Sequence, residues 1–297
     1  MITVRVPATS ANLGPGFDCF GIALGLYGTF SFEEREAGFE FEGVDERYCS
    51  EENLAVQAYF RALEEMGCPR NGLYLKIETK IPVSRGLGSS ASLIAAGLCA
   101  ANEAHGRPLD DAALLRLATE LEGHPDNVAP ALLGGLTVSW IEVGAEPLTM
   151  RYSVDDRYRF CALIPDFELS TERARAVLPR QISRADAIYN ISRAAILIEG
   201  LRSGNPAGVA CGMHDLLHQP YRIPLIDGYE AIRDAAIQRG ALGVCISGAG
   251  PTILCVTQAD QIGATFPERM NRALEKMRRN WQVLPLCVDG EGTVRVG

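Results

Sequence analysis

Residues 82–92 combine two glycines with several serines directly before a stretch of helical character. The segment reads Pro82-Val83-Ser84-Arg85-Gly86-Leu87-Gly88-Ser89-Ser90-Ala91-Ser92. Glycines let a main chain approach an anion closely, and the first turn of a helix presents unpaired N–H groups and the positive end of its dipole. The hydroxyls of Ser89 and Ser90 can reach phosphate oxygens or a metal ion. The segment predicts a phosphate cradle, although a closely packed helix start made of small residues would show the same pattern.

Two common phosphate-binding motifs do not account for this segment. The spacing Gly86-x-Gly88-x-x-Ala91 formally matches the dinucleotide fingerprint. The strand before it, residues 73–81, alternates apolar and charged residues, whereas the first strand of a dinucleotide-binding fold is buried on both faces. A Gly-Lys-Ser/Thr sequence is absent, which excludes a Walker A loop. A phosphate cradle of a different kind remains.

Two further glycine loops lie before and after this segment along the chain. Residues 7–18 follow a strand and place Asn12 and Asp18 six positions apart, which suits a ligand with an amine or a hydroxyl. The same residue types are also common in simple turns. Residues 246–252, between two apolar strands, form either a tight hairpin loop or a loop whose main chain faces a ligand.

An acidic segment separates the second loop from the third. Glu120 and Glu122 end a predicted helix, where the dipole disfavours negative charge. Either a divalent cation or exposure to solvent would compensate these carboxylates. His124 and Asp126 can orient a substrate hydroxyl or cap a turn, and Asp126-Asn127 is also a typical helix start.

Two other catalytic patterns are weaker. His214 and His218 have a spacing that zinc sites use on helices, but no glutamate follows His214 and no third ligand is evident. We therefore expect a structural role for both histidines. The chain also lacks the Gly-x-Ser-x-Gly elbow of serine hydrolases, since the run that begins at Gly88 has no second glycine in that position.

The elements that must position these loops are a mixture of strands and helices. In the first half we predict strands at 2–6, 73–81, 135–143 and 147–152, a hairpin of 27–34 with 38–44, and helices at 53–66, 89–104 and 110–121. After a polar junction at 153–157 we predict strands at 159–164, 282–288 and 293–296, helices at 171–177, 184–202, 206–217, 227–239 and 267–279, and a strand–loop–strand at 242–257. Because most of the strands are half-exposed, the pattern favours α+β layers over a doubly wound parallel sheet.

Composition narrows the class of protein. The 297 residues are 47% hydrophobic and 22% charged, with a formal net charge of −9, so the chain is globular rather than disordered. Acidic charge without a Lys/Arg cluster argues against nucleic acid or an anionic membrane as the main partner. The nine cysteines include no C-x-x-C pair and are typical of reduced thiols. The chain starts on a strand, and no apolar run approaches the roughly 20 residues of a membrane span, so we expect a soluble cytoplasmic protein.

Taken together, the three loops resemble the motifs of the GHMP small-molecule kinases. The most specific match is the run Pro82-x-x-x-Gly86-Leu87-Gly88-Ser89-Ser90-Ala91, and it lies between the other two loops as the family requires. The resemblance covers essentially the whole chain. It implies a two-domain α+β fold, with an N-terminal ATP-binding domain at 1–153 that contains an unusual left-handed βαβ unit. A ferredoxin-like C-terminal domain would follow at 154–297.

Within the family, segments 7–18, 122–130 and 247–252 are most similar to members that phosphorylate L-homoserine. The resemblance implies transfer of phosphate from ATP to the side-chain hydroxyl, giving O-phospho-L-homoserine on the route to threonine, and a homodimer. Residues 82–92 would bind the ATP phosphates and Asn53 the adenine. Ser90 would hold Mg²⁺ with one glutamate of the 120/122 pair, of which we favour Glu122.

The resemblance also implies the residues on the substrate side. Asn12 and Asp18 match residues that meet the substrate hydroxyl and amino group, and Asn127, with His124 nearby, matches the opposite side of the pocket. The remaining substrate contacts would be Thr171, Arg175 and Arg222, with the two guanidinium groups clamping one carboxylate. Asp18, Asp126 and Asn127 would act in catalysis, and Asp126 would either remove the hydroxyl proton or only orient the hydroxyl.

Three other functions are consistent with parts of this pattern. A relative that phosphorylates another small alcohol, such as mevalonate, shikimate or a sugar, would not need both a carboxylate clamp and an amine partner. An ATP-dependent decarboxylating lyase of the same superfamily would release CO₂. A ligand sensor on the same fold would bind without turnover, but it would have no need to keep the serines and glutamate of a metal site.

Overall fold

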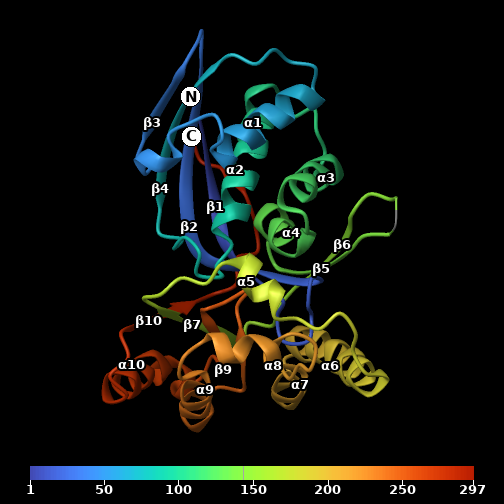
Figure 1. The fold of residues 1–297 in the computed structure, drawn as a ribbon, viewed down its shortest axis with the longest axis vertical. Helices are drawn as coiled ribbons and strands as arrows, with labels where there is room; N and C mark the ends of the chain where they lie inside the picture. The colour runs from blue at the N-terminus through green and yellow to red at the C-terminus, as the bar shows by residue number, and fades with distance from the viewer. Residues whose placement is uncertain (143) are drawn as a thin grey trace.

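The computed structural model describes residues 1–142 and 144–297, whose strands form two separate sheets (Figure 1). The first sheet contains β1 (Ile2–Ala11), β2 (Phe20–Arg35), β3 (Phe39–Glu42), β4 (Gly72–Thr79), β5 (Leu136–Trp140), β6 (Leu148–Tyr152) and β11 (Val294–Arg295). The second contains β7 (Tyr158–Pro165), β8 (Gly243–Ile246), β9 (Ile253–Gln258) and β10 (Trp281–Leu286). The C-terminal strand β11 pairs with β1, so the chain returns to the first sheet at its end.

The helices fall into two groups that accompany the two sheets (Figure 1). With the first sheet lie α1 (Leu54–Glu65), α2 (Ser89–Ala104), α3 (Asp111–Glu122) and α4 (Pro125–Leu133), after the short 3-10 turn η1 (Glu46–Tyr48). With the second lie α6 (Arg184–Ser203), α7 (Pro206–Gly212), α8 (Gln219–Arg222), η2 (Ile223–Leu225), α9 (Tyr229–Gln238) and α10 (Gln261–Lys276). Helix α5 (Thr171–Ala176) lies where the two halves meet (Figure 1). No helix in the described ranges has both the length and the apolar character of a membrane span.

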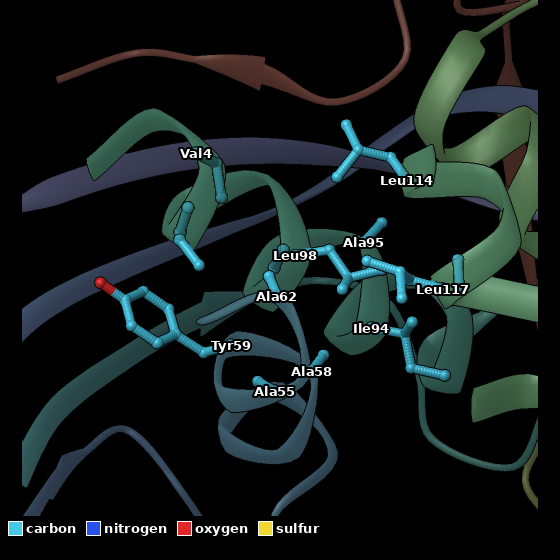
Figure 2. Close-up of a cluster of buried hydrophobic side chains, with 14 of the residues drawn as sticks. Val4, Ala55, Ala58, Tyr59, Ala62, Ile94, Ala95, Leu98, Leu114 and Leu117 are labelled. Atoms are coloured by element: carbon cyan, nitrogen blue, oxygen red, sulfur yellow. The ribbon is translucent and has the colours of Figure 1, made fainter. Parts of the chain in front are cut away.

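Helix α2 is the centre of the first core, because its small residues let neighbouring helices approach closely. Figure 2 shows alanines of α1 against Ile94 and Leu98 of α2, with Leu114 and Leu117 of α3 on another side. At Gly97 a Cβ atom would lie 2.2 Å from the carbonyl oxygen of Ala55. This close packing holds α2 rigidly and therefore fixes the position of its N-terminus.

The second sheet has the strand order β10-β7-β9-β8, and every neighbouring pair is antiparallel. Numbered along the chain, these strands have the order 4-1-3-2, which is the ferredoxin-like arrangement. The predicted α+β fold with a ferredoxin-like second half is confirmed. The division of the chain between residues 153 and 154 stays a prediction.

The predicted hairpin of residues 27–34 with 38–44 is wrong. Strand β3 pairs in parallel with β4, and α1 lies between them in the chain, so β3, α1 and β4 form a βαβ unit. The reason is that β1 and β4 already occupy the two sides of β2 over this stretch. Only the outer edge of β4 is left for β3.

Other boundaries also differ from the prediction. Strand β1 continues through a register shift at Pro7 to Ala11, five residues further than expected. The predicted helix 206–217 ends at Gly212, and residues 213–218 are irregular. Helix α4 was foreseen only through its start signal at Asp126-Asn127. Strand β5 ends at Trp140, and residue 143 of the predicted strand lies outside the described residues.

Candidate active site

The three glycine loops meet at the junction of the two halves and are bonded to one another. The hydroxyl of Ser247 donates to the carbonyl of Gly86 at 2.6 Å and lies 2.8 Å from the hydroxyl of Ser10. The N–H of Gly248 donates to the carbonyl of Ala11 at 2.9 Å. Ser10 and Ser247 are fully buried, so these bonds are shielded from water.

Two glycines of the second loop are required by these contacts. A Cβ on Gly86 would lie 2.2 Å from the carbonyl oxygen of Ser247, and one on Gly88 would lie 1.9 Å from Oγ1 of Thr9. Both glycines also have left-handed φ angles, of 76° and 71°. These glycines allow main chains within the protein to approach one another closely. The segment is therefore a closely packed helix start, and it also lies beside an open cavity.

A cavity of about 730 Å³ lies beside the loops and takes its walls from both halves of the molecule. Most of the predicted site residues line it: Asn12, Asn53, Val83, Ser84, Arg85, Gly86, Gly88, Ser89, Ser90, Ser92, Glu122, His124, Asp126, Asn127, Thr171, Arg175 and Arg222. Pro82, Leu87, Ala91 and Asp18 are not among the lining residues. Leu87 and Ala91 are completely buried, one in each of two hydrophobic cores, and so anchor the segment.

Within the predicted phosphate segment, several side chains serve the protein itself. The hydroxyl of Ser92 donates to the carbonyl of Ser89 inside the first turn of α2. The guanidinium of Arg85 donates to the carbonyls of Pro165 and Asp166 at the end of β7 and so joins the two halves. Among the lining groups of this segment, Gly88, Ser89 and Ser90 lie at the N-terminus of the 16-residue helix α2.

Ser90 and Glu122 come together although they are 32 positions apart in the sequence. The hydroxyl of Ser90 donates to the carboxylate of Glu122 at 2.6 Å. Burial raises the pKa of Glu122, and the bond from Ser90 opposes that effect. Glu120 lies away from this point, 44% exposed and paired with Arg61 and Arg116. Of the two glutamates, only Glu122 lines the cavity.

The donor set at this point fits Mg²⁺. The ion prefers hard oxygen ligands and keeps several positions for water and substrate phosphates, so one carboxylate and one hydroxyl are an ordinary protein share. A partly desolvated carboxylate with a raised pKa gains most from a nearby cation. In the described residues no cluster of three or more His, Cys, Asp or Glu side chains has the form of an all-protein metal site.

His124, Asp126 and Asn127 lie together at the start of α4. Nδ1 of His124 is 2.5 Å from a carboxylate oxygen of Asp126, which is almost completely buried. This bond raises the pKa of His124. Asn127 is held by Thr9, whose hydroxyl donates to its amide oxygen at 2.8 Å. The carboxylate of Asp126 also benefits from its place in the first helical turn.

The predicted arginine pair is present, but its two members have different partners. Arg175 on α5 makes two bonds to the carboxylate of Asp18, at 2.8 and 3.0 Å. Arg222 on α8 is 1% exposed and donates to the main-chain carbonyls of Ala174 and Gly248, each at 3.1 Å. Burial, with the charge of Arg175, lowers the pKa of Arg222 to about 10.

Asn12 joins this group to the third loop. Its amide donates to the carbonyl of Gly248 at 2.9 Å and accepts from the main-chain N–H of Asp18 at 2.8 Å. Asn12 and Asp18 both have left-handed φ angles, near 59° and 55°, which asparagine and aspartate tolerate better than most residues. The first loop is therefore held in a defined turn whose polar groups face Arg175 and Arg222.

Asn53 caps α1 as well as lining the cavity. Its side-chain oxygen accepts from the N–H of Ala55, and its amide donates to the carbonyl of Tyr48. Around it lies an apolar wall that the sequence analysis missed: Phe30, Val44, Tyr48, Leu54, Ile77 and Leu93. No periodic pattern marks residues 45–52 around Tyr48, because they form loops and one 3-10 turn. The other five wall residues lie in predicted strands and helices, whose patterns do not show that they face one cavity.

Phe17 and His218 were also missed as members of the site. Phe17 lies within the first glycine loop, directly before Asp18. The guanidinium carbons of Arg222 and Arg175 lie 5.1 and 5.7 Å from the centre of its ring. His218 was predicted only to have a structural role, and its spacing of four residues from Arg222 is the sequence signal that could have connected the two.

Comparisons with known proteins agree with this geometry. Residues 53–135 match the family described as GHMP kinases N terminal domain, and residues 197–281 match GHMP kinases C terminal. A Clostridium botulinum protein named homoserine kinase is 45% identical, with 99% of this chain and 98% of that protein covered. The chain belongs to the GHMP kinase family.

Two further GHMP kinase relatives support the assignment. A Clostridium beijerinckii protein, also named homoserine kinase, is 43% identical over 98% of this chain and 97% of its own length. The crystal structure of homoserine kinase from Cytophaga hutchinsonii superimposes with a TM-score of 0.89 at 28% identity, covering 99% of this chain and 97% of that one. The two-domain GHMP kinase fold predicted from the sequence is therefore confirmed.

The bond between Ser247 and Gly86 gives a test of the loop junction. We expect Ser247→Ala to lower the free energy of unfolding by about 1–3 kcal/mol, because it leaves the carbonyl of Gly86 without this donor and the buried hydroxyl of Ser10 without this partner. Ser203→Ala is the matched control, since Ser203 also donates to a carbonyl but is exposed on α6; it should change stability by less than about 0.5 kcal/mol. Urea unfolding of the two variants measures both values, and equal losses would contradict the argument.

Proposed function

We propose that this GHMP kinase transfers the terminal phosphate of ATP to the side-chain hydroxyl of L-homoserine, forming O-phospho-L-homoserine for threonine biosynthesis. The names of its full-length relatives support this substrate. The observation that carries the proposal is the charge arrangement at one end of the cavity. Two guanidinium groups, Arg175 and Arg222, line the cavity beside a helix N-terminus suited to phosphate, and Arg175 holds the carboxylate of Asp18, which does not itself line the cavity. An amino-acid alcohol presents the complementary amine and carboxylate.

On the ATP side, we assign the phosphates to the main-chain N–H groups at the start of α2 and the adenine to the apolar wall around Tyr48 and Leu54. Ser90 and Glu122 would hold Mg²⁺, which neutralises charge on the phosphates during transfer. Asn53 would meet the base through the amide proton that its cap bonds leave unused. These residues position the nucleotide and do not change covalently.

On the substrate side, Arg222 and Arg175 would bind the carboxylate and Asp18 the amino group. Thr171 and Asn12 line the same end of the cavity and would complete the pocket. Substrate binding would replace part of the Arg175–Asp18 pair with bonds to the two ends of one molecule. Holding the hydroxyl in line with the phosphate supplies most of what a loose phosphoryl-transfer step needs.

Asp126 is better placed to orient the hydroxyl than to remove its proton. Its carboxylate already forms a 2.5 Å bond with His124, whose pKa it raises. That bond already occupies one oxygen of the carboxylate and fixes its direction. We therefore propose that Asp126 and Asn127, with His124, fix the direction of the hydroxyl. The homodimer implied by the family resemblance stays a prediction.

The main experiment measures ADP release by the purified protein with L-homoserine, mevalonate, shikimate, a hexose and L-homoserinol, which lacks the carboxylate. We expect kcat/KM for L-homoserine to exceed that of every other alcohol by at least about 100-fold, since buried charges reject a ligand that cannot pair with them. Phosphorus NMR identifies the product, and a CO₂ assay tests for a lyase. Preference for another alcohol, or CO₂ release, would overturn the proposal.

The metal ligand is tested by a matched pair of glutamate variants. Glu122→Gln should lower kcat by about 100-fold or more and raise the Mg²⁺ concentration needed for half-maximal rate, because the carboxylate charge at the phosphates is lost. Glu120→Gln, two positions away on the same helix, should change kcat less than about 2-fold because its side chain is on the surface. A larger effect from Glu120→Gln would reverse the assignment.

The binding of the substrate carboxylate by the two arginines is tested at Arg175. Its side chain is more exposed than that of Arg222, so its replacement disturbs the folded structure less. Arg175→Ala should raise KM for L-homoserine by about 10- to 100-fold while KM for ATP changes little, as expected for a charged bond to one substrate only. Arg173→Ala, on the exposed side of α5, is the control. Steady-state kinetics with each substrate varied in turn give both constants. Unchanged KM for L-homoserine would remove Arg175 from the clamp.

A further inference from the structure

His218 is a completely buried side chain behind the substrate end of the cavity. It lies in the irregular segment between α7 and α8, directly before the helix that carries Arg222. Its ring stacks on Phe17 with the ring centres 5.4 Å apart, and Phe17 in turn contacts both arginines. His218 does not line the cavity, so its influence must pass through a neighbouring residue.

The hydrogen bonds of His218 define which ring nitrogen carries the proton. Nε2 lies 2.9 Å from the carbonyl oxygen of Gly14, which can only accept, so Nε2 donates. Burial lowers the pKa of His218 and outweighs the carboxylate of Asp215, so the ring is neutral. Nδ1 therefore presents a lone pair, and it lies 3.3 Å from Nη1 of Arg222. His218 accepts a hydrogen bond from the guanidinium.

The orientation of the Arg222 guanidinium depends on this acceptor because its other partners are neutral main-chain carbonyls. In the described part of the chain it forms no ion pair with a carboxylate, and its remaining bonds go to the carbonyls of Ala174 and Gly248. These bonds use Nε and Nη1 and leave Nη2 for an anion. Burying a cation without a counter-ion costs free energy. Hydrogen bonds to neutral acceptors must therefore hold the guanidinium in place until an anion binds.

The ring of His218 is itself held from behind. The carboxylate of Asp215 accepts from the main-chain N–H groups of residues 217, 218 and 219 at 2.7–2.9 Å, and from the side chain of Asn190 at 2.7 Å. These bonds fix the backbone at His218, while Phe17 covers one face of the ring. The imidazole cannot turn without breaking buried bonds, which makes it a rigid support.

We propose that His218 is a positioning residue that directs the guanidinium of Arg222 toward the carboxylate of the acceptor and so selects acceptors that carry this carboxylate. The proposal rests on the proposed function. The irregular segment between α7 and α8 places the two ring nitrogens between Gly14 and Arg222. The bond that His218 donates to the carbonyl of Gly14 also connects Arg222, through the imidazole, to the first glycine loop, which holds Asp18.

Two variants separate the two bonds of the ring. His218→Gln can keep the donor to Gly14 but loses the acceptor for Arg222, whereas His218→Asn can keep an acceptor near Nδ1 and loses the donor. We expect His218→Gln to raise KM for L-homoserine at least about 10-fold, with KM for ATP within about 2-fold. The preference for L-homoserine over L-homoserinol should fall by a similar factor. His218→Asn should restore both values to within about 3-fold of the unmodified protein, even if its thermal stability is lower.

The outcomes distinguish this inference from the proposed function. If the unmodified protein does not phosphorylate L-homoserine, the proposed function fails first. If it does, but both variants change KM equally and in step with their melting temperatures, His218 is only structural and the inference is overturned. An unchanged KM in His218→Gln overturns it as well. A third variant, Asn190→Ala, loosens the support without touching the ring nitrogens and should give a smaller shift than His218→Gln in the same direction.

Discussion

The contact among three glycine loops is the constraint on which the rest of the site depends. Ser247 bonds to Gly86, and Gly248 bonds to Ala11, so the two halves of the chain are joined through main-chain atoms. This junction places the N-terminus of α2, from the first half, beside α5 and α8, from the second. Under the proposed function, groups from both halves are thereby held at fixed distances around one cavity, which meets the positional requirement of phosphoryl transfer.

The charges around the cavity follow from the cost of burial. Ser90 donates to Glu122, His124 to Asp126, and Arg175 to Asp18, so that each of these carboxylates has a donor. Arg222 is the exception, since its described partners are neutral acceptors. Under the proposed function, Arg222 is therefore the cation of this group that would gain a counter-ion from the substrate carboxylate. Selectivity and stability then come from the same few buried bonds.

Sequence reasoning found the loops and most of the polar side chains because their residue types carry specific chemistry. Glycines before a helix, a pair of adjacent serines and a Gly-His-Pro-Asp-Asn run are rare together, and the structure brings them to one cavity. The apolar wall of the cavity was missed because Tyr48 lies in a segment without a period and the other members come from separate elements that only the tertiary structure brings together. Asn53 was assigned to adenine from a resemblance, and the structure adds a helix-capping role. The hairpin of β2 and β3 was wrong because local alternation cannot show that β1 and β4 already flank β2.

The chain alone was enough to establish the fold class, the three loops and the family, since short-range patterns and residue chemistry carry that information. Which carboxylate stands beside Ser90, which arginine is neutralised by Asp18, and which histidine supports Arg222 were decided only by tertiary structure. These relations join residues that are 32, 157 and 4 positions apart, and they depend on where helices end and which way side chains face. Spacing in a sequence limits which residues can meet, but burial and packing determine the partner each charged group finally has.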